Sequence, residues 1–215
     1  MTIELSQRSG EITQSDIRAM TMACRKVNGV NLAQGVCDLG VPDPVARGVS
    51  EAIARGYNTY TRYDGLPELR EAIARKMRTY NGMTVDPEGE IIVSAGSTGA
   101  FYTACLALLN PGDEVILFEP YYGYHVNMLL AAGAVPRAVP MRPPDWTIDF
   151  GALEAAVTSR TRGIVICTPG NPSGKVHTEA ELGALAAFAT RHDLVVFTDE
   201  IYEYFVYDGR RHISP

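Results

Sequence analysis

Apolar residues in the first third of the chain recur at helical spacing. Leu69, Ile73 and Met77 fall at i, i+4 and i+8 with charged residues between them, which predicts a helix over residues 67–80. The same reading gives two further helices and two loops rich in glycine, proline or tyrosine: helices over 12–27 and 45–57, loops over 31–44 and 57–65.

After residue 90 the pattern changes to short apolar runs separated by helical stretches. The runs cover residues 91–93, 115–118, 134–139, 163–167 and 194–197. They do not alternate with polar residues, which is typical of strands buried on both faces of a mostly parallel sheet. The segments between them are expected to be helices over 98–109, 122–132, 150–157 and 179–192. This alternation predicts an α/β layered fold, in which ligands bind beyond the carboxyl ends of the strands.

Length, composition and charge narrow the class of protein. The 215 residues are 46% hydrophobic and 20% charged, as in ordinary globular domains. Nineteen basic and 25 acidic residues give a net charge of −6, which argues against a nucleic-acid partner. No apolar run approaches the roughly 20 residues of a membrane span, and residues 1–12 lack the apolar core of a signal peptide, so we expect a cytoplasmic protein. The four cysteines and four histidines are not spaced as metal ligands, so no metal site is expected.

Two segments that follow apolar runs carry groups suited to a phosphate and to a flat ring. Gly96, Ser97 and Thr98 lead from a predicted strand into a predicted helix, where unpaired N–H groups and hydroxyls favour an anion. Residues 119–124 (EPYYGY) place three tyrosines at the end of the next strand, where they can stack on a ring. Each segment also has a purely structural interpretation, as a helix cap and as aromatic packing.

Two later strand ends carry an amide and a carboxylate. Asn171 lies within residues 168–175 (TPGNPSGK), a loop restricted by prolines and glycines, and its side chain can donate to a phenolate or a carboxylate. Asp199 directly follows residues 194–198, the last apolar run with Thr198, and a carboxylate there is costly without a positive partner. A pyridinium N–H is one such partner; an ordinary turn and a helix N-cap are the structural alternatives for the two residues.

In this order and spacing, these segments resemble the class I/II aminotransferases, which are pyridoxal-phosphate (PLP) enzymes of fold type I. The resemblance runs from about residue 30 to the end and rests on six stretches: NLAQG (31–35), YTRYDG (60–65), GST (96–98), EPYY (119–122), NPSG (171–174) and TDEIY (198–202). It implies a PLP-binding large domain over residues 45–215, preceded by an N-terminal arm and substrate-side loop over residues 1–44.

The resemblance implies how the cofactor is held. Gly96, Ser97 and Thr98 would bind the PLP phosphate, and Tyr122 would stack on the pyridine ring. Tyr60 would reach the phosphate of a neighbouring subunit, so the resemblance also implies a homodimer.

The resemblance further implies which residues act on the reaction. Asp199 would pair with the ring nitrogen and Tyr202 would bond the phenolic oxygen, and these two are the implied catalytic residues. Asn171 would bond the same oxygen and, with the backbone of Gly35, contact the substrate.

The register of Gly35 stays open at this point. Residues 35–38 (GVCD) have cysteine where the family commonly has proline, whereas residues 40–43 (GVPD) match the Gly-x-Pro-Asp pattern. If Gly40 is the substrate-facing glycine instead, the loop before it is longer.

By resemblance, the activity is transfer of an amino group from an amino acid to a 2-oxo acid. The family's Schiff-base lysine lies downstream of the Asp-x-x-Tyr segment, and the lysines of this chain, Lys26, Lys76 and Lys175, do not match it. We therefore expect an N-terminal portion without the C-terminal small domain, inactive by itself, with sheet edges left unpaired.

Three other interpretations stay open. A PLP-dependent lyase or decarboxylase of the same fold would keep the same ring-binding residues, because these do not select the reaction. A non-catalytic fragment or subunit would also lack the lysine. A transcription factor with an aminotransferase-like domain would need a basic DNA-binding domain before residue 30.

Overall fold

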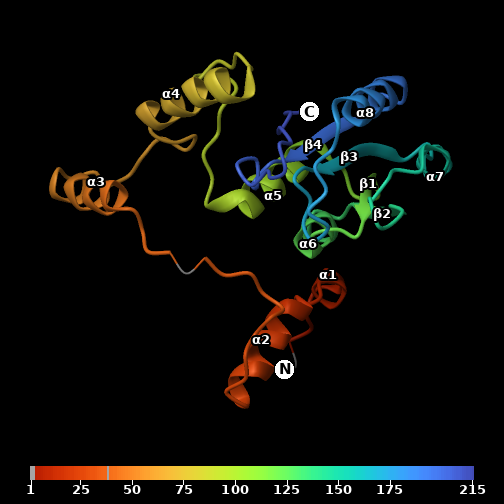
Figure 1. Ribbon diagram of the computed structural model, residues 1–215, viewed down its shortest axis with the longest axis horizontal. Helices are drawn as coiled ribbons and strands as arrows, with labels where there is room; N and C mark the ends of the chain where they lie inside the picture. Colours follow the sequence, from red (N-terminus) through yellow and green to blue (C-terminus); the bar gives the residue numbers. More distant parts are fainter. Residues whose placement is uncertain (1–2, 38) are drawn as a thin grey trace. The chain divides into compact units, whose positions relative to one another are not determined.

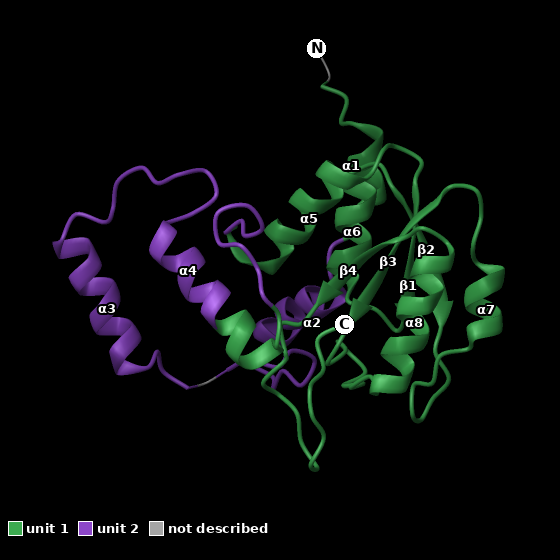
Figure 2. Ribbon diagram, turned by 90° about the horizontal axis from the view of Figure 1, so that it is seen from above, with its two compact units in different colours: residues 1–13, 76–83, 94–215 green, residues 14–75, 84–93 purple. Residues whose placement is uncertain are grey.

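The structure, a computed structural model, describes residues 3–37 and 39–215 and divides into two compact units (Figure 2). Unit 1 comprises the described part of residues 1–13 together with residues 76–83 and 94–215. Unit 2 comprises the described part of residues 14–75 together with residues 84–93. No helix of the described residues is long and apolar enough to cross a membrane.

Unit 1 is built on a four-stranded parallel sheet, which confirms the predicted α/β fold (Figure 1). The strands are arranged in the order β2-β1-β3-β4, with β1 (Glu114–Glu119), β2 (Val135–Pro140), β3 (Thr161–Cys167) and β4 (Val195–Asp199). The central strands β1 and β3 are buried along most of their length, as predicted. The prediction of burial on both faces is wrong for β2 and β4, because each is an edge of the sheet in the described chain.

Helices cover both faces of this sheet (Figure 2). One face packs against α5 (Gly96–Leu108) and α6 (Gly123–Ala131), and the other against α7 (Phe150–Ala155) and α8 (Glu179–Arg191). Successive residues of β1 explain this arrangement, because side chains alternate between faces along a strand. Val115 and Leu117 enter the core with α5 and α6, whereas Ile116 and Phe118 enter the core with α7 and α8.

Among the remaining helices, α1 (Gln7–Glu11) was not predicted, and the others are shorter than, or shifted from, the predicted spans. These others are α2 (Asp16–Lys26), α3 (Asp43–Ala54) and α4 (Pro67–Lys76), which is followed by the π-helical turn η1 (Met77–Asn81). Gly82 ends this turn in the left-handed conformation, at φ 71°, which glycine adopts without strain.

The strand predicted over residues 91–93 is wrong. This segment pairs with no strand of the described chain, and its one backbone hydrogen bond to a distant segment runs from Val93 N–H to the Asp64 carbonyl at 3.0 Å. Ile91 is buried, but Ile92 is 67% exposed. An apolar run predicts burial, whereas a strand also needs a partner, and the run itself carries no information on that partner.

The sheet begins with a buried ionic cluster at Glu114, the first residue of β1, which is fully buried. Its Oε1 accepts from the guanidinium groups of Arg137 at 2.7 Å and Arg160 at 2.5 Å, and its Oε2 accepts from the Thr158 hydroxyl at 2.6 Å. The bond from Arg137 is the largest of several that together lower the pKa of Glu114 to about 2. The cluster therefore joins β1 to β2 and to the start of β3.

We expect Glu114→Gln to destabilise the protein at neutral pH and to matter less in acid. Because folding lowers the pKa of Glu114 from about 4.5 to about 2, its ionised form stabilises the fold above the higher value. That contribution is lost as the pH falls between the two values. Urea unfolding at pH 7 and at pH 3 measures the free energy of unfolding of wild type and Glu114→Gln. The control is Glu51→Gln, on the exposed surface of α3. A difference between wild type and Glu114→Gln that stays constant with pH would contradict this account.

Candidate active site

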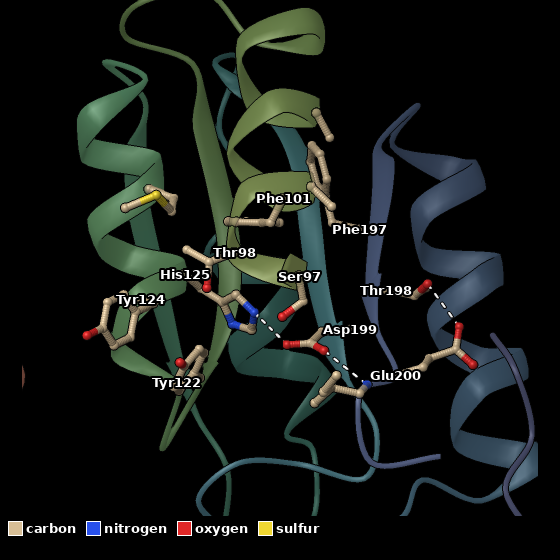
Figure 3. Close-up of a pocket in the computed structure, with 14 residues that line it drawn as sticks. Ser97, Thr98, Phe101, Tyr122, Tyr124, His125, Phe197, Thr198, Asp199 and Glu200 are labelled. Carbon is tan, nitrogen blue, oxygen red and sulfur yellow. Dashed lines mark hydrogen bonds and ion pairs between the residues drawn. The ribbon is translucent and has the colours of Figure 1, made fainter. Parts of the chain in front are cut away.

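A cavity of about 320 Å³ lies in unit 1 at the carboxyl end of β4 (Figure 3). Its wall combines the start of α5, the first turn of α6 and the end of β4. The side chains that give it chemical character are those of Ser97, Thr98, Tyr122, His125 and Asp199. Four of these five residues were predicted site residues, separated by up to 102 positions in the sequence.

Strand alternation aims Asp199 into this cavity. Phe197 packs in the core on the α5 and α6 side of the sheet, so Asp199, two residues later, faces the same side. Thr198 faces the opposite way, and its hydroxyl donates to Glu200 at 3.1 Å (Figure 3). Cys167 lies opposite Asp199 in the parallel register of β3 and β4 and therefore adjoins it.

The Asp199 carboxylate is held by two hydrogen bonds. Oδ2 lies 2.9 Å from Nε2 of His125, and Oδ1 accepts from the backbone N–H of Ile201 at 3.2 Å. Burial raises the pKa of Asp199, but the bonds from His125 and Ile201 outweigh burial, and the pKa falls below its usual range. Asp199 is therefore ionised at neutral pH, and its two oxygens retain lone pairs for a further donor.

His125 is the site residue that the sequence reasoning missed. Its side chain is 7% exposed and packs against Phe101, at 5.0 Å between ring centroids, and edge-on against Tyr122, at 5.4 Å. His125 follows Tyr122 by three residues, which is one helical turn, so the start of α6 presents both side chains together. That spacing is the available signal, because Asp199 lies 74 residues away.

The start of α5 offers a site for an anion. Gly96 has φ 83°, in the left-handed region that favours glycine, and no side chain caps the helix at Ala95. Backbone N–H groups in the first turn of a helix have no partner within the helix. Here they lie beside the hydroxyls of Ser97 and Thr98 at the cavity wall.

Tyr122 also borders a second, smaller cavity, of about 20 Å³, which Asn171 helps to line. Burial is the main cause that raises the pKa of Tyr122, so its hydroxyl is protonated at neutral pH. The loop that carries Asn171 is closed by a hydrogen bond from Gly170 N–H to the Lys175 carbonyl at 2.8 Å. Asn171 therefore lies on a turn held by this hydrogen bond, and it lines the smaller cavity together with Tyr122.

Five predicted site residues are not among those that line the larger cavity of unit 1: Gly96, which begins α5, Asn171, which lines the smaller cavity, and Tyr202, Gly35 and Tyr60. Tyr202 is 38% exposed and packs edge-on against Phe205, at 6.0 Å between ring centroids. Gly35 and Tyr60 belong to unit 2, where both are exposed. Residue 38, in the segment that left the register of Gly35 open, lies outside the described residues.

Two of the three lysines have ionic partners. Lys175 Nζ lies 2.7 Å from Glu181 Oε1 and 3.3 Å from the Asp145 carbonyl, to which it donates. Lys76 is paired with Glu203. Neither is among the residues that line the larger cavity.

One group of side chains in the described chain has the spacing of metal ligands: Glu200, Glu203 and His212. Their carboxylate oxygens and His212 Nε2 already have protein partners, whereas His212 Nδ1 is buried without one among the described residues. Glu200 Oε2 lies 2.7 Å from His212 Nε2 and accepts from Ser214 Oγ at 2.7 Å. Glu203 is paired with a lysine and accepts from an asparagine amide. This group is therefore an internal hydrogen-bond network.

The family profile of the class I and II aminotransferases matches residues 27–214, and the chain belongs to that family. The parallel sheet with helices on both faces is the fold of the type I aminotransferase structures that it matches, as predicted. The N-succinyldiaminopimelate aminotransferase structure from Mycobacterium tuberculosis has a TM-score of 0.93 at 38% identity, covering 98% of this chain and 55% of that chain.

Two similar sequences are named for different substrates. The aspartate/prephenate aminotransferase of Thermus thermophilus is 38% identical over 199 residues, covering 92% of this chain and 51% of that protein. Kynurenine–oxoglutarate transaminase 1 of Homo sapiens is 36% identical over 198 residues, covering 86% and 47%. This chain thus spans about half the length of the relatives that it matches.

We expect Cys37 to react with iodoacetamide at pH 8 long before Cys105 and Cys167. Cys37 is exposed, whereas burial raises the pKa of Cys105 to about 11, and burial with the charge of Asp199 raises the pKa of Cys167 to about 12. Peptide mass spectrometry measures the modification of each thiol, and labelling in urea is the control. Labelling of Cys167 at the rate of Cys37 in the folded protein would show that this part of the site is open.

Proposed function

We propose that this chain forms the cofactor-binding portion of a PLP-dependent aminotransferase, which moves an amino group from an amino acid to a 2-oxo acid. The observation that carries the proposal is the ionised Asp199 carboxylate, held by His125, in a cavity that also borders the uncapped start of α5. Family membership and the aminotransferase names of the relatives support it.

The residues present fit PLP in charge, shape and hydrogen bonding. Ser97, Thr98 and the first-turn N–H groups suit a dianionic phosphate, and the Tyr122 ring offers a face or edge for a pyridine ring. Asp199 keeps lone pairs for a protonated ring nitrogen. A cavity of about 320 Å³ also falls within the usual size of small-molecule sites.

When bound, PLP supplies an electron sink for the charge that develops at the substrate Cα. Asp199 contributes a fixed negative charge, which holds a proton on a nitrogen placed against it. His125 fixes the direction of the carboxylate, and the surrounding rings limit the access of water, which would weaken the pairing of charges.

The other predicted roles are part of the proposal. Asn171 and Tyr202 donate to the phenolic oxygen, and Asn171 with the Gly35 backbone contacts the substrate. Asn171 lines the small cavity beside Tyr122, and this position supports its proposed contact with the cofactor. Tyr60 contacts the phosphate held by a second copy of the chain, in a homodimer.

The larger cavity of the described unit 1 has no lysine to move the proton at the substrate Cα. The relatives are about twice as long as this chain. We propose that the lysine that moves the proton at Cα, and the small domain, come from the other half of a longer protein. The N-terminal arm of residues 1–44 and the PLP-binding domain of residues 45–215 then form its first half.

Tyr122→Ala is expected to weaken PLP binding by about tenfold, the order of one lost aromatic stacking contact. Absorbance titration of the 215-residue chain with PLP measures the dissociation constant. Tyr207→Ala, at a tyrosine that is 70% exposed, is the control and should leave it unchanged. Equal affinity of wild type and Tyr122→Ala would argue against stacking at this position.

Asp199→Ala is expected to lower amino-transfer turnover of the longer protein by about 100-fold or more, because a neutral ring nitrogen is a poor electron sink. Steady-state kinetics with an amino acid and a 2-oxo acid measure the turnover, and circular dichroism confirms that the fold persists. Near-normal turnover of Asp199→Ala would contradict the role of Asp199.

A further inference from the structure

In unit 2, the loop between α3 and α4 presents a cleft of about 430 Å³. Its lining includes one guanidinium group and four hydroxyl groups, and no acidic side chain among the described residues. These groups belong to Arg55, Tyr57, Thr59, Tyr60 and Thr61. A cation with several hydroxyl donors is the chemistry that recognises an oxyanion such as a phosphate monoester.

The Tyr60 side chain is fully exposed. Its position therefore follows from the backbone of the loop. One end of the loop is attached to α3 by the hydrogen bond from Tyr57 N–H to the Ala52 carbonyl, at 2.9 Å. The other end reaches Asp64, and there the structure places an unusual concentration of charge.

Arg70, on α4, is fully buried. Its guanidinium lies 3.0 Å from Asp64 Oδ2 and 3.0 Å from Glu88 Oε1, and it donates to the Pro87 carbonyl at 2.8 Å. Arg62 donates to both oxygens of Asp64, at 2.7 and 3.0 Å, and to Glu88 at 3.0 Å. We call Arg62, Asp64, Arg70 and Glu88 the ion cluster.

The ion cluster holds the end of the loop in one place. A buried guanidinium is stable only while its partners stay in position, so Arg70 restrains Asp64. Burial raises the pKa of Asp64, but Arg62 and Arg70 lower it below its usual range, so Asp64 is ionised at neutral pH. The next residue, Gly65, has φ 104°, and a Cβ there would lie 2.7 Å from the Val93 side chain. This close fit fixes the backbone further.

We infer that the ion cluster is a positioning device for Tyr60, which it holds ready to contact the PLP phosphate bound by a second copy of the chain. This inference rests on the proposed function, in which Tyr60 serves the neighbouring site. It adds four residues that touch neither cofactor nor substrate and act through the loop that carries Tyr60.

The test compares PLP with pyridoxal, which lacks the phosphate. Dissociation constants for both are measured by absorbance titration, at a protein concentration where sedimentation shows a dimer. The variants are Tyr60→Phe, Asp64→Asn, their combination, and Glu88→Gln, a milder change because that side chain is 61% exposed. The matched control is Glu71→Gln, which breaks only an exposed pair with Arg75 on the same helix as Arg70.

Asp64→Asn is expected to reduce the preference for PLP over pyridoxal by about tenfold, and Glu88→Gln by about threefold, on the scale of tenfold per lost charge-assisted bond. Pyridoxal affinity should stay within about twofold of wild type. The double variant should lose no more than Tyr60→Phe alone, because both changes remove the same contact. Glu71→Gln should behave as wild type.

Three results would overturn the inference. An unchanged preference in Asp64→Asn and Glu88→Gln, with a reduced one in Tyr60→Phe, would leave the role of Tyr60 standing and remove that of the ion cluster. Equal loss of PLP and pyridoxal affinity would mean that the cluster acts on the fold alone. A wild-type chain with no preference for PLP would contradict the proposed function itself, and the inference with it.

Discussion

The parallel pairing of β3 with β4 is the interaction on which the candidate site depends. It sets Cys167 opposite Asp199 and continues one residue further, where Thr168 N–H donates to the Asp199 carbonyl at 3.0 Å. Because side chains alternate along a strand, a slip of one residue would turn Asp199 toward the opposite face of the sheet. His125 and the start of α5 would then face Thr198, which carries no charge.

Two acidic side chains at the ends of the sheet show how the same chemistry serves stability and function. Glu114 begins β1, and its carboxylate accepts from Arg137, Arg160 and Thr158, so its partners are groups of the protein itself. Asp199 ends β4 and accepts one donor on each oxygen in the described structure. The Glu114 carboxylate joins β1 to β2 and to the start of β3. The Asp199 carboxylate is ionised, borders a cavity and keeps capacity for a ligand.

Much of the fold could be predicted from the sequence because it depends on local patterns. The apolar runs of β1 and β3 and the amphipathic face of residues 67–80 are properties of neighbouring residues. The failures concern partners. Residues 91–93 look like a strand but pair with none in the described chain, and β2 is more exposed than its composition indicated.

The candidate site divides in the same way. Ser97, Thr98, Tyr122 and Asp199 could be predicted because each lies shortly after an apolar run of the sequence, and they do line one cavity. His125 and Arg70 could not be predicted in this way. His125 depends on a contact with a residue 74 positions away and Arg70 on a contact 18 positions away. Both side chains are buried, which their polar character does not indicate. These contacts form only in the folded chain.

The most direct test of the account is the protonation state of a ring nitrogen placed against Asp199. PLP labelled with ¹⁵N in the ring is bound to the chain, and its nitrogen resonance is followed by NMR as the pH rises. We expect the bound nitrogen to stay protonated well above the pH at which free PLP loses this proton. In Asp199→Ala the bound nitrogen should titrate as it does in free PLP. A bound ring nitrogen that titrates as it does in water would contradict the assignment of this cavity as a PLP site.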